Sequence, residues 1–568
     1  MQQSLWWQKA VFYQIYPRSF ADGNGDGIGD FEGMLAKLDY LKWLGVDALW
    51  LSPHYPSPNV DCGYDVSDYC AVAPEYGSLE LFDRFLHAAH LRGIKVVLDM
   101  VLNHTSNEHN WFHESRSNLE NPKRDWYIWH PGDGKGNPPN NWYSTFGGPA
   151  WELDPLTNQY YYHFFFKEQP DLNWRNPEVK AAMFGAVRFW LDKGVDGFRL
   201  DAVGTIFETP GLPNQRSRET QDSLFRLQHL AQTPIEQRKV VHAWQSMFRH
   251  QVDLPEVHDL MKELRRLVDT YQHTVLIGET DDIRFYGNRQ DELHTVFNFP
   301  LMRATRLTPS WVARNQKKRL TILPEGAWPC NTLGNHDSPR IRTRYGDGQH
   351  DVEINKLNLA LMLTLRGTPV LYNGEEIGMT DFSDFTKEQL RDSFSLFVYG
   401  LASRFPGISQ TDALKIAIKE GRDKNRTPLQ WSNEPNGGFS PAEVQTWLPV
   451  NPSYEREVNV AEQMADPASL LNFYREFLVL RRSLPALHSG EYNLVAVRGN
   501  ILAFRRFTDQ QTLLVILHFG STTQGFMLPP NLSERKIVYS NHHRTSGIIF
   551  TRRMRLLPFE VLIVEEKN

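Results

Sequence analysis

Short runs of apolar residues alternate with longer amphipathic segments over residues 10–374. The short runs lack a polar face, which is typical of strands covered on both sides of a parallel sheet. The segments between them carry apolar residues at helical spacing, as at Met34, Leu38 and Leu41 before Gly45. The predicted strands span residues 10–17, 48–53, 95–101, 197–201, 275–280, 295–299, 331–337 and 368–374. Eight such strands with helices between them predict an α/β fold, the (β/α)8 or TIM barrel.

Helix boundaries support this alternation. Asn176 is an N-cap residue, Pro177 suits the first helical turn and Gly194 ends the helix before the fourth strand. A second helix is expected to begin at Ser78 and to end near Gly93. In a barrel of this kind the active site lies at the carboxyl ends of the strands.

Two intervals break the rhythm, and they define the expected domains. Residues 1–103 and 171–489 are assigned to the barrel, and residues 104–170 to an inserted irregular domain rich in Pro, Gly, Asn and aromatic residues. A further excursion at about 380–456 contains one expected helix, at 412–420. Residues 490–568 change to short β-type runs and predict a C-terminal antiparallel β-sandwich. These runs are 494–497, 502–507, 513–518, 537–539 and 556–564.

Composition narrows the function. The 61 basic and 67 acidic residues give a net charge of −6, and no basic tract suggests a nucleic-acid partner. No apolar run is long enough to span a membrane, and residues 1–10 do not resemble a secretion signal. The 3 cysteines form no metal-ligand pattern, which favours a reducing compartment, the cytoplasm. The 12% aromatic content suits sugar binding but is equally compatible with plain packing.

An acidic, glycine-rich loop follows the first strand. Its side-chain oxygens alternate with glycines, an arrangement suited to a hard cation such as Ca²⁺ or Mg²⁺. The twelfth position is Gly33 instead of a bidentate Glu, so the loop is not an EF-hand. A solvated acidic turn is the alternative. The candidate side-chain ligands are Asp22, Asn24, Asp26 and Asp30.

Polar residues gather at the predicted strand ends. On a strand, Arg199 and Asp201 point the same way, so the arginine would keep the carboxylate ionised, although a structural ion pair is the alternative. Charged groups on several strand ends are difficult to explain by stability alone, because a buried charge is costly unless it is paired. The residues at strand ends are Asp99, Asn103, His104, Arg199, Asp201, Glu279, His336 and Asp337.

The chain resembles the α-amylase superfamily of retaining glycoside hydrolases, family 13, in its α-glucosidase and oligo-1,6-glucosidase branch. The matching segments are DMVLNH at 99–104, GFRLDAV at 197–203, IGET at 277–280 and GNHDSPR at 334–340. Further matches are AVFYQIYPRSF near the N-terminus, QPDLNW at 169–174, GTPVLYNGEEIGM at 367–379 and GRDKNRTPLQW at 421–431. The segments cover nearly the whole chain in the expected order, but residues 381–421 follow no matching pattern.

The resemblance implies that Asp201 is the nucleophile, Glu279 the acid/base and Asp337 the third carboxylate. The apolar run before Glu279 is expected to raise its pKa by desolvation. The resemblance also implies that Asp61 pairs with Arg422 to close the glucose pocket, which would make the enzyme exo-acting; a weak rim salt bridge is the alternative. Ala202 would favour α-1,4 over α-1,6 bonds, or would merely pack behind the strand. Implied substrate contacts are Asp61, Tyr64, His104, Phe146, Phe165, Gln169, Arg199, Ala202, His336, Arg422 and Arg426.

The resemblance implies a structural Ca²⁺, with Mg²⁺ as the alternative ion. Its ligands would be the loop side chains and the backbone carbonyl of Ile28. The expected activity is release of terminal non-reducing glucose from short α-glucosides, with maltose favoured. The nearest alternative is a glucosyl-transferring or isomerising relative acting on sucrose, maltose or trehalose. A remote alternative is a non-enzymatic transporter-subunit relative. We expect a small α-glucoside as the partner, no nucleic acid or membrane, and a monomer or small homo-oligomer.

Overall fold

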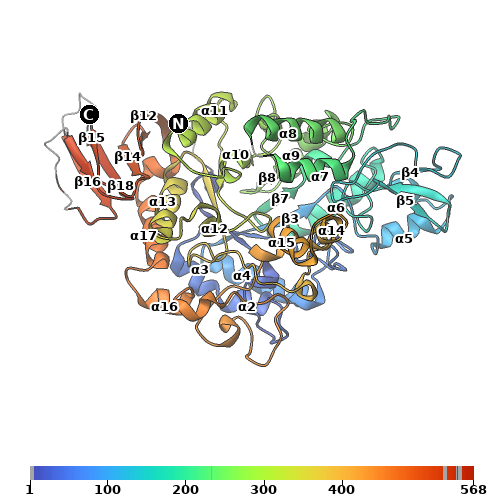
Figure 1. Ribbon diagram of the computed structural model, residues 1–568, viewed down its shortest axis with the longest axis horizontal. Coiled ribbons are helices and arrows are strands. Elements are labelled where there is room, and N and C mark those ends of the chain that lie inside the picture. The colour runs from blue at the N-terminus through green and yellow to red at the C-terminus, as the bar shows by residue number, and fades with distance from the viewer. Residues whose placement is uncertain (1–4, 232, 529–533, 545–546, 548–552, 568) are drawn as a thin grey trace.

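A computed structural model describes residues 5–231, 233–528, 534–544, 547 and 553–567 (Figure 1). Eight strands form one parallel sheet in the order β10-β11-β1-β2-β3-β7-β8-β9. A parallel bridge between Phe297 and Cys330 joins the end of β9 to β10, so the sheet closes into a barrel. The eight predicted strands and the barrel are therefore confirmed. The strands are β1 (Phe12–Ile15), β2 (Ala48–Leu51), β3 (Lys95–Val101), β7 (Gly197–Asp201), β8 (Val275–Gly278), β9 (Thr295–Val296), β10 (Cys330–Thr332) and β11 (Thr368–Tyr372).

The two helices predicted from N-cap residues begin at those residues. The Ser78 and Asn176 side chains accept hydrogen bonds from the backbone amides of Leu81 and Glu178. The predicted helix before Gly45 is two helices, separated at Lys37. The helices of the barrel and its C-terminal extension are α1 (Trp6–Lys9), α2 (Phe31–Ala36), α3 (Leu38–Leu44), α4 (Leu79–Leu91), α6 (Pro177–Asp192), α9 (Glu256–Val268), α10 (Phe299–Met302), α11 (Pro309–Ile322), α12 (Ile341–Tyr345), α13 (Asp351–Thr364), α16 (Val460–Ala465), α17 (Leu470–Ser483) and α18 (Pro485–Ser489).

The insertion after β3 contains α5 (Asn110–Ser117) and a three-stranded antiparallel sheet. This sheet consists of β4 (Trp129–His130), β5 (Trp151–Asp154) and β6 (Gln159–Tyr162), in the order β4-β6-β5. An antiparallel bridge between His104 and Asp171 joins the two ends of the insertion. The insertion therefore leaves and rejoins the barrel at one point, beside the carboxyl end of β3.

Two helix pairs extend the rim of the barrel further (Figure 1). The pair α7 (Gln221–Leu230) and α8 (Pro234–Phe248) follows β7, and the pair α14 (Ser393–Ala402) and α15 (Gln410–Glu420) follows β11. Phe225 of α7 lies 6.0 Å from Phe397 of α14, measured between ring centroids, so the two pairs touch. The sequence predicted only the helix that corresponds to α15.

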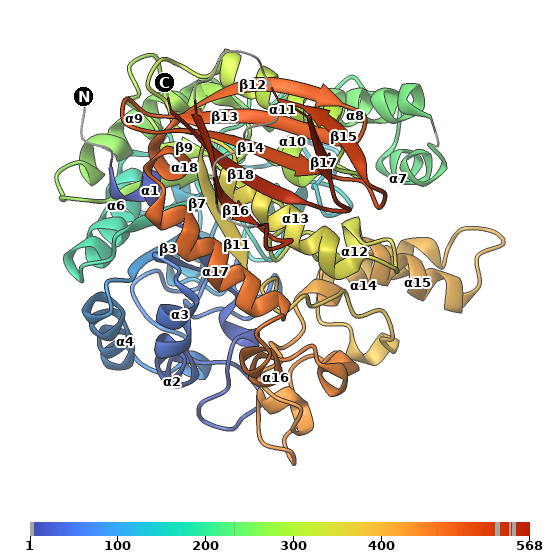
Figure 2. The ribbon, with the colours of Figure 1, turned by 90° about the vertical axis from the view of Figure 1, so that its left-hand side faces the viewer.

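The C-terminal strands form two antiparallel sheets, seen in red in Figure 2. One has the order β12-β13-β14-β18-β16 and the other pairs β15 with β17. The predicted run 556–564 is not one strand, because Pro558 and Phe559 form a turn in which Phe559 has φ 50°. The strands are β12 (Glu491–Arg498), β13 (Ile501–Phe507), β14 (Thr512–His518), β15 (Gln524–Met527), β16 (Glu534–Ser540), β17 (Arg553–Leu556) and β18 (Val561–Lys567).

Alternate residues of the larger sheet face two different cores. Ile501 and Leu514 pack with Phe526 of β15, between the two sheets. Leu502 and Val515 instead belong to the main core of the barrel. The C-terminal domain is therefore packed directly on the barrel. Within the described ranges, no helix has the length and apolar character needed to cross a bilayer.

Candidate active site

One buried guanidinium holds three carboxylates together at the carboxyl ends of the barrel strands. Arg199 is only 1% exposed. Its Nη1 lies 2.8 Å from Asp99 Oδ1 and 2.7 Å from Asp201 Oδ1. Its Nη2 lies 2.9 Å from Glu279 Oε1. Asp99 and Arg199 are register partners on β3 and β7, and Glu279 directly follows β8, so three neighbouring strands build this cluster.

The environment separates the proton affinities of the two central carboxyls. Burial raises the pKa of Glu279 to about 8, against the opposing effect of Arg199. Burial also raises the pKa of Asp201, to about 6, and Arg199 counteracts it only in part. Arg199 does lower the pKa of Asp201, as expected. Burial raises it by more, so the net shift is upward. Near neutral pH, Glu279 carries a proton and Asp201 is mostly ionised.

Asp337 has the opposite electrostatic environment. Its Oδ1 accepts a hydrogen bond of 2.6 Å from Arg426 Nη2, and Arg422 Nη1 lies 3.7 Å from the same oxygen. Its Oδ2 lies 3.3 Å from His336 Nε2. Burial alone would raise the pKa of Asp337, but these cationic and imidazole neighbours hold it well below its usual range. Asp337 is therefore a permanent anion beside the Asp201–Glu279 pair.

His336 is fixed as a neutral hydrogen-bond donor. The Gln14 amide Nε2 lies 2.7 Å from His336 Nδ1, and this donor leaves the ring proton on Nε2. Nε2 lies 2.6 Å from the Tyr64 hydroxyl, which in turn donates to Asp99 Oδ2 at 3.1 Å. Burial lowers the pKa of His336 to about 3. A chain of hydrogen bonds thus runs from β1 through His336 and Tyr64 to Asp99.

Asp61 and Arg422 meet although they are 361 residues apart in the chain. Arg422 Nη2 donates to Asp61 Oδ1 at 2.7 Å, and both side chains are largely buried. Gln169 Nε2 donates to the other Asp61 oxygen at 3.2 Å and lies 3.0 Å from His104 Nε2. The structure therefore brings Asp61, Gln169 and His104 together with Arg422, the arginine that the family resemblance implies as the partner of Asp61.

Aromatic rings complete the same wall. The Arg422 guanidinium lies 5.4 Å from the centre of the Phe146 ring. Phe146 and Phe165 have ring centroids 5.5 Å apart, and Phe165 meets His104 edge to face at 5.0 Å. A continuous set of contacts therefore runs from Phe146 through Phe165, His104, Gln169 and Asp61 to Arg422, which also faces Asp337.

Ala202 occupies an uncommon backbone conformation directly after Asp201. Its φ of 42° and ψ of 43° are in the left-handed region, which non-glycine residues rarely adopt. Its backbone amide donates to Glu279 Oε2 at 2.9 Å. Strained residues of this kind cluster at functional sites, and here the strain aims an amide at the second carboxyl.

Hydrogen bonds to backbone amides organise the acidic loop. Asp22 accepts from the amides of Gly25 and Gly27, and Asp26 accepts from the amide of Ile28. Asp30 caps α2 through Gly33 and accepts two further amides. Burial raises the pKa of Asp30, and the nearby Asp22 carboxylate adds to this rise. In the described part of the chain, no group of three or more His, Cys, Asp or Glu side chains converges as a metal site.

The loop oxygens nevertheless suit a hard cation. Asn24 Oδ1 and Asp26 are on the exposed side of the loop, with Asn24 Nδ2 only 3.2 Å from Asp26 Oδ2. Carboxylate, amide and carbonyl oxygens are the ligands that Ca²⁺ takes. The ligands of such an ion would be the side chains of Asp22, Asn24, Asp26 and Asp30 and the carbonyl of Ile28. This loop contains none of the residues Asp201, Glu279 and Asp337.

Sequence reasoning missed two residues that shape the site. Gln14 fixes the His336 tautomer, and its only signal is that it is the one amide in an otherwise apolar and aromatic first strand. Asp392 binds Arg422 and has no local signal, since its partner is 30 residues away. Asp99, which was noted only as a strand-end residue, shares Arg199 with Asp201.

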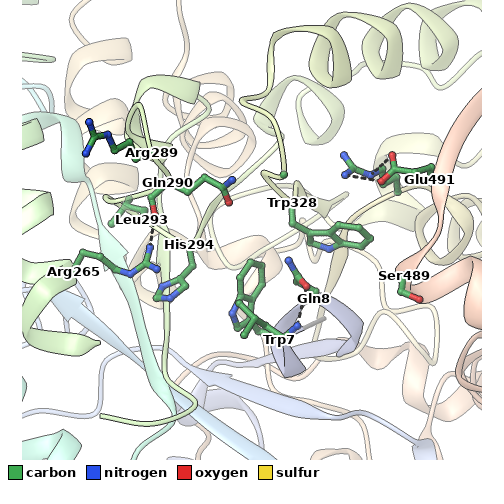
Figure 3. Close-up of a pocket in the computed structure, with 13 residues that line it drawn as sticks. Trp7, Gln8, Arg265, Arg289, Gln290, Leu293, His294, Trp328, Ser489 and Glu491 are labelled. Atoms are coloured by element: carbon green, nitrogen blue, oxygen red, sulfur yellow. Dashed lines mark hydrogen bonds and ion pairs between the residues drawn. The ribbon is translucent and has the colours of Figure 1, made fainter. Parts of the chain in front are cut away.

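A cavity of about 600 Å³ lies at the opposite end of the barrel (Figure 3). Trp7, Gln8, Gln290, His294 and Trp328 line it, and the rings of Trp7 and His294 are in edge-to-face contact with centroids 5.6 Å apart. Trp328 and His294 precede β10 and β9. The two tryptophans are 4% and 6% exposed, so their rings are packed and present little surface. None of the carboxylates described above lines this cavity, so it is separate from the candidate active site.

Comparison with known proteins agrees with this geometry. Residues 14–490 match the family model described as "Alpha amylase, catalytic domain". The chain therefore belongs to the α-amylase family, glycoside hydrolase family 13.

Within that family, the predicted resemblance to the α-glucosidase and oligo-1,6-glucosidase branch is confirmed. The oligo-1,6-glucosidase of Parageobacillus thermoglucosidasius is 38% identical over 99% of this chain and 99% of its own length. The alpha-glucosidase of Pediococcus pentosaceus is 38% identical over 91% of this chain and 92% of its own length.

Among solved structures, an alpha-glucosyl transfer enzyme is similar, with a TM-score of 0.85, 36% identity and 100% of both chains covered. An isomaltulose synthase mutant from Erwinia rhapontici NX5, in complex with sucrose, is similar with a TM-score of 0.87, 35% identity and 100% of both chains covered.

Proposed function

We propose that the protein is a retaining, exo-acting α-glucosidase that releases terminal non-reducing glucose from short α-glucosides. The arrangement around Arg199 carries this proposal. One guanidinium contacts both Asp201 and Glu279, so the two carboxyl groups are close neighbours. Retaining glycosidases need one ionised and one protonated carboxyl group about 5–5.5 Å apart. Asp201 and Glu279 have the corresponding split in pKa, about 6 and about 8.

The reaction then follows in two steps. In the first, an Asp201 oxygen bonds to the anomeric carbon while the glycosidic C–O bond breaks and the Glu279 proton moves to the leaving oxygen. In the second, a water molecule attacks the anomeric carbon, Glu279 takes its proton and the ester bond to Asp201 breaks. Asp337 remains an anion throughout, able to accept hydrogen bonds from sugar hydroxyls. His336 lies beside it, with Nε2 3.3 Å from Asp337 Oδ2 and hydrogen-bonded to Tyr64.

The closed wall supports exo action. The Asp61–Arg422 pair and Gln169 occupy one side of the site, where a further sugar unit of an internal chain segment would have to pass. Because both charged side chains are buried and paired, opening this wall is costly. We therefore propose that the pocket holds a single glucose unit.

Two observations point to different preferred linkages, α-1,4 and α-1,6. The small Ala202 side chain supports α-1,4 cleavage, with maltose preferred over isomaltose. The similarity to oligo-1,6-glucosidases instead supports cleavage of α-1,6 bonds. The similarity to an alpha-glucosyl transfer enzyme and an isomaltulose synthase supports a second candidate, transfer or isomerisation of glucosyl groups, because hydrolysis and transfer share one covalent intermediate.

A product time course tests these alternatives. The purified protein is incubated with maltose, isomaltose, sucrose and trehalose, and free glucose is measured against new glycosides. NMR also records which glucose anomer appears first. We expect α-glucose as the first product and little transfer. Predominant formation of new glycosides would favour the second candidate, whereas initial release of β-glucose would contradict the retaining mechanism.

We further propose a structural Ca²⁺ in the loop that contains Asp22 and Asp26, with Mg²⁺ as the alternative ion. When bound, the ion would neutralise the loop carboxylates and stabilise the loop. A cytoplasmic location remains a prediction from the low cysteine content.

A further inference from the structure

A buried carboxylate from the segment after β11 contacts the wall of the pocket. Asp392 precedes α14 and is fully buried. Its Oδ1 accepts a hydrogen bond of 2.6 Å from Arg422 Nη2, and its Oδ2 accepts bonds of 3.2 and 2.9 Å from Arg422 Nε and the Arg422 backbone amide. Asp392 therefore fixes both the backbone and the side chain of Arg422.

The same Arg422 nitrogen that binds Asp392 also reaches Asp61. Nη2 lies 2.6 Å from Asp392 Oδ1 and 2.7 Å from Asp61 Oδ1. Because Asp392 takes the Nε and Nη2 edge of the guanidinium, Nη1 is directed to Asp337, 3.7 Å away. We propose, given the glucosidase function proposed above, that Asp392 is a positioning residue that holds Arg422 against Asp61 and so limits the pocket to one glucose unit.

The first turn of α14 also holds the other side of this wall. Ser393 Oγ donates to the Val60 carbonyl at 2.6 Å, one residue before Asp61. Gly421 precedes Arg422 and lies so close to α14 that an added Cβ would meet Ser395 Oγ at 1.8 Å. The turn therefore fits tightly between the two segments that supply the charged pair.

Charge explains why Asp392 acts through Arg422. Burial would raise the pKa of Asp392, but Arg422 holds it well below its usual range. Three carboxylates, those of Asp61, Asp337 and Asp392, surround the single Arg422 guanidinium. Without the Asp392 anion, Arg422 is free to move toward the other two carboxylates, and the wall loses its fixed position.

The test is Asp392→Asn, measured with maltose and with a 4-nitrophenyl α-maltoside blocked by a benzylidene group at its terminal glucose. Asn is as good an N-cap as Asp, so α14 keeps its cap while the anion is lost. We expect KM for maltose to rise about tenfold with a smaller change in kcat, as is typical of lost ground-state binding. We also expect release of 4-nitrophenol from the blocked substrate, which the intact wall excludes.

The double variant Asp392→Asn/Arg422→Ala shows whether the effect passes through Arg422. In the Arg422→Ala background, the second substitution should add nothing to KM. Asp412→Asn, at an exposed acidic residue of α15, is the matched control and should leave both substrates unaffected. An unchanged KM and no activity on the blocked substrate in Asp392→Asn would overturn the proposal, as would equal effects with and without Arg422.

Two other results, an inactive unmodified protein and a variant that does not fold, are distinguished from failure of the proposal. If the unmodified protein releases no glucose from any α-glucoside, the proposed function fails, whatever Asp392 does. If Asp392→Asn does not fold, Asp392→Ser, which keeps an N-cap side chain but removes the charge, is measured instead. In that variant, unchanged KM together with continued exclusion of the blocked substrate would contradict the positioning role.

Discussion

The backbone amide of Ala202 donates a hydrogen bond of 2.9 Å to Glu279 Oε2. The residue after the proposed nucleophile thus binds the proposed acid, and it does so from a left-handed backbone conformation with φ 42°. A change of side chain at Ala202 therefore acts on the pocket volume and on the position of Glu279 at once.

For Ala202→Val, we expect a narrower preference for maltose over isomaltose. The added methyl groups fill space near the leaving sugar, and a methyl-sized difference changes specificity by about 10–200-fold. Valine is β-branched and poorly suited to positive φ, so we also expect kcat to fall on both substrates. The measurement is kcat/KM for the two sugars. Ala202→Gly, which relieves the backbone without filling the pocket, is the control; faster wild-type cleavage of isomaltose would show that Ala202 does not set the choice.

The pH dependence of kcat/KM should be bell-shaped. Activity needs Asp201 ionised, so it falls below its pKa of about 6; it needs Glu279 protonated, so it falls above its pKa of about 8. The two limbs belong to the interacting pair as a whole. A pH series with maltose measures both limbs. For Glu279→Gln on an activated aryl glucoside we expect the alkaline limb to disappear, and its persistence would assign that limb to another group.

Asp201→Asn should abolish turnover without loss of the fold. Removal of a nucleophile lowers kcat by at least about 10³-fold. Because three carboxylates share Arg199, loss of one charge relieves repulsion, and we expect an equal or higher Tm. Circular dichroism melting and maltose kinetics test both statements. Near-wild-type kinetics, with deamidation excluded by mass spectrometry, would remove Asp201 as the nucleophile.

Glu279→Gln should be most harmful for substrates with poor leaving groups. General acid catalysis contributes about 10²–10⁴-fold, and an activated aryl glucoside needs little of it. The comparison is kcat for maltose against kcat for 4-nitrophenyl α-glucoside. Equal losses on both substrates would show that Glu279 does not protonate the leaving oxygen.

Chelation should lower the Tm without abolishing turnover. A cation that binds only the folded state stabilises it by mass action, and the Asp22–Asp30 loop contains none of the catalytic side chains. Melting curves with EDTA, Ca²⁺ and Mg²⁺ measure the effect. Asp26→Asn is expected to reproduce the chelated Tm and to abolish the response to added ion. An unaltered Tm on chelation, together with no metal by elemental analysis, would contradict the prediction.

The barrel could be predicted because its strands are buried on both faces. Apart from the charged residues Lys95, Asp99, Arg199 and Asp201, β3 and β7 are apolar, so they differ clearly from the amphipathic helices. Three of the four rim helices, α7, α8 and α14, were not predicted. α14 has apolar residues around most of its circumference, because it packs against α15 on one side and α7 on another. The turn at Phe559 was missed because it is short and lies between two strands, β17 ending at Leu556 and β18 beginning at Val561.

The candidate site divides in a similar way. Arg199 and Asp201 could be placed together from their spacing on one strand. The Asp61–Arg422 contact depends on the packing of chain segments 361 residues apart, and only family resemblance suggested it. The net pKa of Asp201 could not be foreseen, because it depends on the depth of burial as well as on the visible arginine.

The strand ends of the barrel hold Asp201, Glu279 and Asp337, whereas Phe146 and Gln169 come from the insertion after β3, and Asp392 and Arg422 from the chain after β11. An exchange of the stretch after β11 with that of a relative would replace Arg422 and Arg426, the partners of Asp61 and Asp337. It would leave the Arg199 cluster with Asp201 and Glu279 intact. The shape of the pocket could thus change in evolution without any change to the proposed nucleophile and acid.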